Sequence, residues 1–125
     1  MNFVLVSPEI VELLHDSALN PGELPGRARD KSLEWALSRV ENGLAYGMIQ
    51  DVFDLAAAYA VAVSQGHVFN DGNKRTAFET MNFCLDANGV LIQWEAEDAG
   101  NIIIQTAQRL IDEDTLADWL RSRAT

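Results

Sequence analysis

Nine consecutive residues, from His67 to Arg75, concentrate more chemically active side chains than any other stretch of the chain. They read HVFNDGNKR and combine one histidine, one acid, two amides, two cations and a glycine. A neutral imidazole accepts a proton from a hydroxyl at neutral pH, and a carboxylate oxygen is a good ligand for Mg²⁺. Lysine and arginine neutralise charge on phosphate oxygens. The segment therefore carries the side chains that phosphoryl transfer requires.

Each residue type has a role that its chemistry permits. His67 is the candidate general base, and Asp71 is the candidate magnesium ligand. We expect Lys74 and Arg75 to bind phosphate and to take part in catalysis with these two residues. Phe69 is expected to point inward and anchor the loop. The residues expected to bind the nucleotide are Phe69, Asn70, Gly72, Asn73, Lys74 and Arg75.

The position of this segment supports the same chemistry. It follows an apolar stretch at 48–65 and precedes an amphipathic stretch at 73–88. Both are predicted to be helices, so the segment ends at a helix N-terminus. Free backbone N–H groups and the helix dipole attract anions there, and Gly72 allows a ligand oxygen to approach the backbone. We expect a phosphate to bind at this N-terminus.

The same residues also have structural interpretations, which stay open at this point. A protonated histidine at a helix C-terminus interacts favourably with the helix dipole, and this interaction alone would explain a histidine at position 67. Asp71 and Asn73 are residue types that cap helix starts. Lys74 and Arg75 could also be solvent-exposed side chains that bind no ligand.

Other conspicuous side chains are expected to be structural. His15 is expected to make a structural hydrogen bond or to lie on the surface. Trp35, Trp94 and Trp119 are expected to pack in the core rather than form a substrate platform. Cys84 is the only cysteine and has apolar neighbours, which favours a buried thiol.

Apolar periodicity predicts an all-α fold of about six helices around a buried central helix. Ser7 and Pro8 are a helix-start signal, and Gly43 and Gly89 are expected to end helices. After a first helix that begins at Pro8, further helices are expected at 30–42, 48–65, 73–88, 96–110 and 112–123, with a short extended piece at 90–94. Two prolines and two glycines at 20–29 predict a long loop that acts as a mobile flap.

Composition limits the classes of protein to consider. With 125 residues, the chain is long enough for one domain, which we expect to cover 1–125. A formal net charge of −10 argues against direct nucleic-acid binding. No apolar run approaches the ~20 residues that span a bilayer, and the start MNFVLVSPEI does not resemble a signal peptide. We therefore expect a cytoplasmic protein without membrane contact.

The HVFNDGNKR string closely resembles the signature of the death-on-curing (Doc) family, which is related to the Fic proteins. That signature is His, any residue, Phe, any residue, Asp or Asn, any residue, Asn, Lys, Arg, and 67–75 matches every fixed position. Similar strings are LLHD at 13–16, LPG at 24–26 and AY at 45–46. The resemblance implies a Fic/Doc-like helical bundle that uses ATP and Mg²⁺. It also implies His67 as base, Asp71 as metal ligand and 72–75 as phosphate ligands.

This resemblance further implies a biological role. Members of the family are toxins of toxin–antitoxin pairs that phosphorylate a threonine of elongation factor Tu and so block translation. The C-terminal segment of a cognate antitoxin is expected to fold into a groove on the toxin. Fic enzymes have a second glycine where this chain has Lys74, and they transfer AMP. A lysine there should obstruct the inner phosphates, so that the terminal phosphate faces His67.

Three alternatives to a phosphate-transferring toxin remain open. The first is a Fic-type AMP transferase, which Gly72 favours and Lys74 disfavours. The second is a catalytically silent module that only binds its antitoxin. A metal-dependent nuclease is disfavoured by the acidic composition. One departure from the family concerns Gln65, where a well-known member has an arginine. Arg27 or Arg29, from the loop at 20–29, is a candidate substitute.

Overall fold

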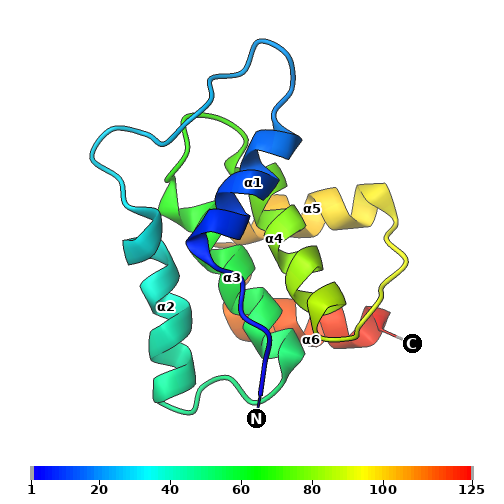
Figure 1. Ribbon diagram of the computed structural model, residues 1–125. Coiled ribbons are helices and arrows are strands. Elements are labelled where there is room, and N and C mark those ends of the chain that lie inside the picture. Colours follow the sequence, from blue (N-terminus) through cyan, green and yellow to red (C-terminus); the bar gives the residue numbers. More distant parts are fainter. Residues whose placement is uncertain (1, 125) are drawn as a thin grey trace.

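The computed structural model describes residues 2–124, and this part of the chain is all-helical (Figure 1). Its helices are α1 (Pro8–Ala18), α2 (Leu33–Ala45), α3 (Val52–Gly66), α4 (Asn73–Ala87), α5 (Ala96–Ala107) and α6 (Glu113–Arg123). α3 packs against α2, α4, α5 and α6, while α1 packs mainly on α4. The predicted class, a bundle of about six helices around a buried central helix, is confirmed.

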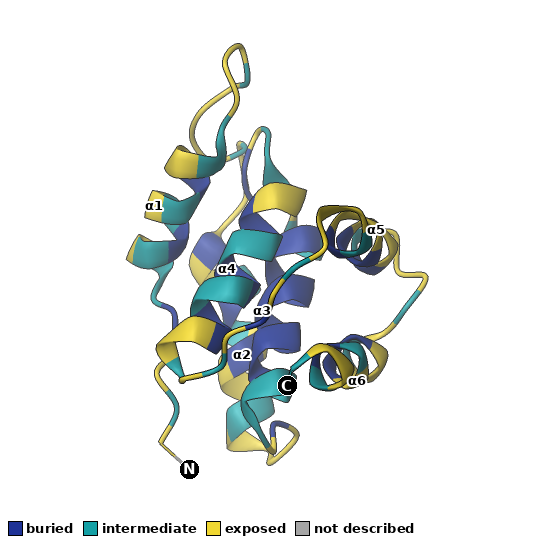
Figure 2. Cartoon of the chain, turned by 90° about the vertical axis from the view of Figure 1, so that its right-hand side faces the viewer, coloured by how far each residue is buried: buried dark blue, intermediate teal, exposed yellow. Residues whose placement is uncertain are grey.

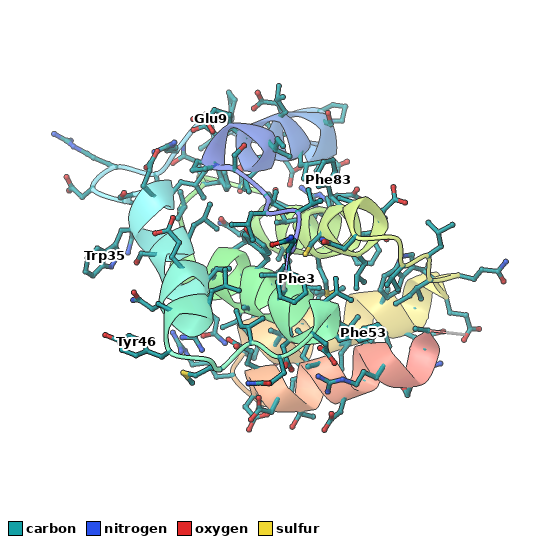
Figure 3. The ribbon with its side chains drawn as sticks, turned by 60° about the horizontal axis from the view of Figure 1, so that its bottom comes forward. Phe3, Glu9, Trp35, Tyr46, Phe53 and Phe83 are labelled. Atoms are coloured by element: carbon teal, nitrogen blue, oxygen red, sulfur yellow. The ribbon has the colours of Figure 1, made fainter. Side chains whose placement is uncertain are left out.

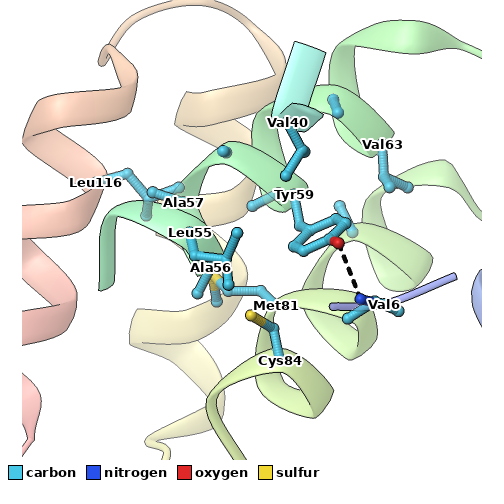
Figure 4. Close-up of a cluster of buried hydrophobic side chains, with 14 of the residues drawn as sticks. Val6, Val40, Leu55, Ala56, Ala57, Tyr59, Val63, Met81, Cys84 and Leu116 are labelled. Carbon is cyan, nitrogen blue, oxygen red and sulfur yellow. Dashed lines mark hydrogen bonds between the residues drawn. The ribbon is translucent and has the colours of Figure 1, made fainter. Parts of the chain in front are cut away.

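The central helix α3 is buried because its sequence is apolar nearly all round. Every residue from Leu55 to Ser64 is buried, and Figure 2 shows α3 enclosed by the other helices. Many of these residues are alanines, whose small side chains allow neighbouring helices to pack closely. Tyr59 is the large exception, and its hydroxyl accepts a hydrogen bond from the backbone N–H of Val6 at 2.8 Å (Figure 4). That bond ties the N-terminal segment to the core.

Side-chain caps explain where several helices begin. Ser7 accepts a hydrogen bond from Ile10 N–H at the start of α1, and Asp112 accepts one from Thr115 N–H before α6. Both helices follow the predicted starts. α2 instead begins at Leu33, because the Ser32 side chain caps it. The predicted start at 30 is therefore too early.

The predicted helix stops are partly wrong. Gly43 lies inside α2, where an added Cβ would stand 3.0 Å from the Ile49 side chain, so this glycine makes room for packing. The chain turns later, at Gly47, with a φ of 69°. α5 ends at Ala107 rather than at 110, because Arg109 adopts a left-handed φ of 61°. The segment 90–94 pairs with no strand within 2–124.

The tryptophans differ from one another. Trp94 stacks on Trp119 with ring centroids 6.1 Å apart, which confirms their packing role. Trp35 is 80% exposed, and Figure 3 shows it pointing away from the bundle, so the packing prediction for this residue is wrong.

Cys84 is buried as predicted, and burial raises the pKa of its thiol to about 12. No helix within 2–124 has the length and apolar character needed to cross a membrane.

Candidate functional site

The segment 67–72 joins the C-terminal end of α3 to the N-terminal end of α4. His67 ends α3 in a left-handed conformation, with φ 50° and ψ 39°, and it is exposed. Gly72 precedes α4 with a left-handed φ of 78°. Because α3 and α4 pack side by side and their connection is short, His67 lies at the same end of the pair as the first turn of α4 (Figure 1).

No side chain caps the N-terminus of α4. Its first helical hydrogen bond runs from Thr76 N–H to Gly72 C=O, at 2.9 Å. The N–H groups of Asn73, Lys74 and Arg75 come before that bond, so they are the free donors of the first turn. Lys74 and Arg75 are exposed and add two positive charges. Free N–H donors and positive charge at a helix N-terminus favour an anion, and phosphate binding at this place stays a prediction.

The side chain of Asn73 is committed to the loop itself. Its Oδ1 accepts a hydrogen bond from Phe69 N–H at 3.1 Å, and its Nδ2 donates to Phe69 C=O at 2.9 Å. The pair closes the chain between these two residues into a ring. The sequence indicated a phosphate ligand, and the backbone N–H of Asn73 remains suited to that role. Its side chain shapes the loop.

Two buried rings support the loop from the inside. Phe69 is 3% exposed and stacks on His15, with ring centroids 3.8 Å apart. The His15 ring is itself buried, and its Nε2 hydrogen-bonds Asp71 C=O at 2.7 Å. A carbonyl only accepts, so Nε2 carries the proton. The structural hydrogen bond predicted for His15 and the inward-pointing Phe69 are confirmed, and burial keeps the Phe69 ring away from a nucleotide.

Asp71 has one engaged and one available carboxylate oxygen. Its Oδ2 accepts a hydrogen bond from Leu24 N–H at 2.8 Å, while Oδ1 has no hydrogen-bond partner within the described chain. Residues 2–124 contain no group of three or more His, Cys, Asp or Glu side chains able to hold a metal. Magnesium that binds with nucleotide phosphates keeps several waters and needs only one or two protein carboxylates. A lone Asp71 therefore fits such an ion.

Arg75 is held by the chain rather than free in solvent. Its Nε donates to Ala18 C=O at 3.0 Å, and its Nη2 forms an ion pair with Glu23. The hydrogen bond from Arg75, followed by that from Asn20 N–H, holds the pKa of the Glu23 carboxyl below its usual value. These two contacts use two of the five N–H donors of the guanidinium, so Arg75 keeps donors for an anion, and an anion that takes the N–H bonded to Glu23 displaces this acid.

The loop at 20–29 lies against the motif. Ala28 N–H donates to Val68 C=O at 2.6 Å, and Asn70 N–H donates to Gly26 C=O at 3.2 Å. The Asn70 side chain also donates to Pro25 C=O at 3.0 Å, so it fastens the loop. The structure thus gives this side chain a partner other than the expected nucleotide. The flap mobility remains a prediction.

Of the two predicted substitutes for the family arginine, Arg27 is engaged elsewhere, and Arg29 stays a prediction. Arg27 donates hydrogen bonds to Glu12 and Glu34, and these bonds, the one to Glu34 most of all, raise its pKa. The arginine that contacts Gln65 is Arg109, whose Nη1 donates to Gln65 Oε1 at 2.8 Å. Sequence reasoning missed this contact because the α5–α6 connection brings Arg109 back to the end of α3.

Comparisons with known proteins agree with the fold and the motif. Residues 5–85 match the model of the Fic/DOC family, a range that includes the whole of 67–75. The protein named "Protein kinase doc" from Escherichia phage P1 is 36% identical over 117 residues, which cover 93% of this chain and 92% of that protein. The chain therefore belongs to the Fic/DOC family.

Proposed function

We propose that the chain is an ATP-dependent protein phosphotransferase that phosphorylates a hydroxyl of another protein. The observation that carries the proposal is an exposed His67 beside an uncapped helix N-terminus that bears Lys74 and Arg75. An imidazole base next to an anion site is the arrangement that phosphoryl transfer needs. The similar phage P1 protein carries the name of a protein kinase.

In this proposal each group of the motif has its own role. The His67 imidazole accepts the proton of the substrate hydroxyl while the oxygen attacks phosphorus. The first-turn N–H groups of α4, together with Lys74 and Arg75, stabilise the charge on the phosphate oxygens. ATP supplies the phosphoryl group, whose bond to the β-phosphate oxygen breaks as ADP leaves, and Asp71 Oδ1 would hold the accompanying Mg²⁺.

Transfer of the terminal phosphate is favoured over transfer of AMP. Lys74 is a long, exposed cation at the position where Fic enzymes have a bare glycine. Its side chain would obstruct the inner phosphates and favour the reversed nucleotide. AMP transfer remains a second candidate because Gly72, which precedes α4, leaves room for a ligand oxygen at the backbone.

The family suggests the biological setting. We infer a cytoplasmic toxin that phosphorylates a threonine of elongation factor Tu and blocks translation. A cognate antitoxin, with a C-terminal segment bound in a groove, would neutralise it. This part of the proposal extends from family membership and not from the geometry of the site.

The test uses purified chain, Mg²⁺ and ATP labelled at either the α or the γ phosphate, with purified elongation factor Tu and with a host lysate as acceptors. Label from the γ position alone is expected on the elongation factor. His67→Ala should abolish transfer and growth inhibition, while its circular dichroism stays unchanged. Label from the α position would indicate the AMP transferase. Growth inhibition by His67→Ala would indicate the silent binding module.

A further inference from the structure

A groove with a volume of about 960 Å³ runs along α2, between this helix, the end of α3 and the α5–α6 connection. Gln65 and Gly66 line it, and these residues directly precede His67. We propose that this groove binds an acidic segment of the protein that receives the phosphate. The inference rests on the proposed function and names a docking site beyond the reacting groups.

Large apolar side chains are exposed along the groove. Trp35 and Tyr46 are each 80% exposed and Met48 is 70% exposed, and all three line the groove. Figure 3 shows Trp35 and Tyr46 projecting from the same side of the molecule. Exposed aromatic side chains of this kind are typical anchors of protein–protein interfaces. They indicate that the occupant is a protein segment with apolar side chains.

The charge of the groove differs from that of the rest of the chain. The chain has 9 Lys and Arg against 19 Asp and Glu. The groove is lined by three of these cations, Lys31, Arg39 and Arg109, and by two of the acids, Asp30 and Glu113. Three cations minus two acids leave a formal charge of +1, against −10 for the chain. An acidic partner is repelled by most of the surface and attracted here.

Two of the cations are already oriented. Arg109 has a left-handed φ of 61°, an uncommon conformation for a residue other than glycine, and Gln65 accepts a hydrogen bond from its Nη1. Arg39 donates through Nε to Glu113 at 3.2 Å and remains 55% exposed at its side chain. A guanidinium has five N–H donors. Each of these two therefore keeps donors for a carboxylate of the partner.

The groove is long enough for a defined peptide segment. α2 has 13 residues and so measures about 20 Å at the usual helical rise. That length accommodates three turns of a partner helix. Because Gln65 and Gly66 line the groove and directly precede His67, a segment seated in it holds the rest of its protein near His67. Binding energy from such a remote contact lowers the KM for the acceptor protein.

The first experiment measures binding without ATP. The probe is a synthetic, fluorescein-labelled 14-residue helical peptide with leucines on one face and glutamates on the other. A second peptide has lysines in place of the glutamates. The glutamate peptide should bind the full chain at least tenfold more tightly than the lysine peptide. Trp35→Ala and Arg39→Glu should each weaken it at least tenfold, whereas Arg123→Glu, which makes the same charge change outside the groove, should not.

Equal affinity for the two peptides would overturn the inference, as would an equal loss in Arg39→Glu and Arg123→Glu. Circular dichroism of each variant separates lost binding from lost folding. Arg39 and Trp35 lie outside the groups assigned to catalysis, so the same variants serve in the kinetic experiment.

The second experiment measures phosphate transfer to purified elongation factor Tu. Arg39→Glu should raise the KM for this acceptor at least tenfold, with kcat and the KM for ATP unchanged, and the glutamate peptide should compete with the acceptor. If the peptide binds but the KM for the acceptor stays the same, the groove serves another partner, such as an antitoxin, and the inference is wrong. If the wild-type chain transfers no phosphate, the proposed function fails and the acceptor assignment fails with it.

Discussion

Replacing Asn73 with alanine removes both hydrogen bonds that close the loop between α3 and α4. These bonds join the Asn73 side chain to the N–H and C=O groups of Phe69, at 3.1 and 2.9 Å, and both are partly buried. A backbone group left without a partner costs ~1–3 kcal/mol when it is fully buried. Water reaches part of this loop, so we take ~1 kcal/mol for each group and expect the free energy of unfolding to fall by ~2 kcal/mol.

Urea denaturation followed by far-UV circular dichroism measures this change. For a denaturant slope of ~2 kcal/mol per molar, a loss of ~2 kcal/mol lowers the midpoint by ~1 M. Asn73→Asp is the matched variant, because a carboxylate still accepts from Phe69 N–H but cannot donate to its C=O. It should show about half of the loss. If Asn73→Ala lost phosphate transfer with an unchanged midpoint, the side chain would act on phosphate and the structural role would be refuted.

Three further predictions concern the scaffold. Tyr59→Phe leaves the buried N–H of Val6 without an acceptor and should lower the free energy of unfolding by ~1–3 kcal/mol, which an unchanged urea midpoint would contradict. The hydrogen bond from Arg27 lowers the pKa of Glu34 to about 2 from 4.5, so the stability that this pair contributes is complete above pH 4.5 and is lost as the pH falls toward 2. Thermal unfolding of wild type and Glu34→Gln should therefore differ at neutral pH and converge in acid, and a gap that persists at pH 2 would argue against the pair. Burial raises the pKa of Cys84 to about 12, so a thiol reagent at mildly alkaline pH should label the chain only after urea unfolds it.

Much of the helical architecture was predictable because its causes are local. An apolar run without polar interruptions marks α3 as central whatever surrounds it. The Ser7 and Asp112 side chains each accept a hydrogen bond from a backbone N–H three residues further along, so a short window of sequence contains both partners. The predicted start of α2 was too early although its cap is also local: Asp30, taken for the start, has a left-handed φ of 64°, and Ser32 is the cap.

Predictions failed where the answer depends on distant elements. Gly43 has the residue type of a helix stop, but it lies inside α2, where the Ile49 side chain packs so closely that an added Cβ would stand 3.0 Å from it. Trp35 has the residue type of a core side chain. Whether a residue of α2 faces α3 or the solvent depends on how the two helices are rotated against each other, and periodicity placed Trp35 on the wrong side.

In the candidate site, too, local sequence predicted some features, while others depend on distant segments of the chain. One of the latter has a consequence for phosphate binding. Residue type and spacing made His67, Lys74 and Arg75 candidates, but the partner of Arg75 comes from the loop at 20–29, through Glu23. Leu24 N–H, one residue further along that loop, bonds Asp71 Oδ2. The candidate phosphate ligand and the candidate metal ligand are thus held by adjacent residues of one loop. A phosphate that takes the Arg75 N–H bonded to Glu23 removes one of these two attachments, and binding in this manner couples occupation of the anion site to the position of the loop.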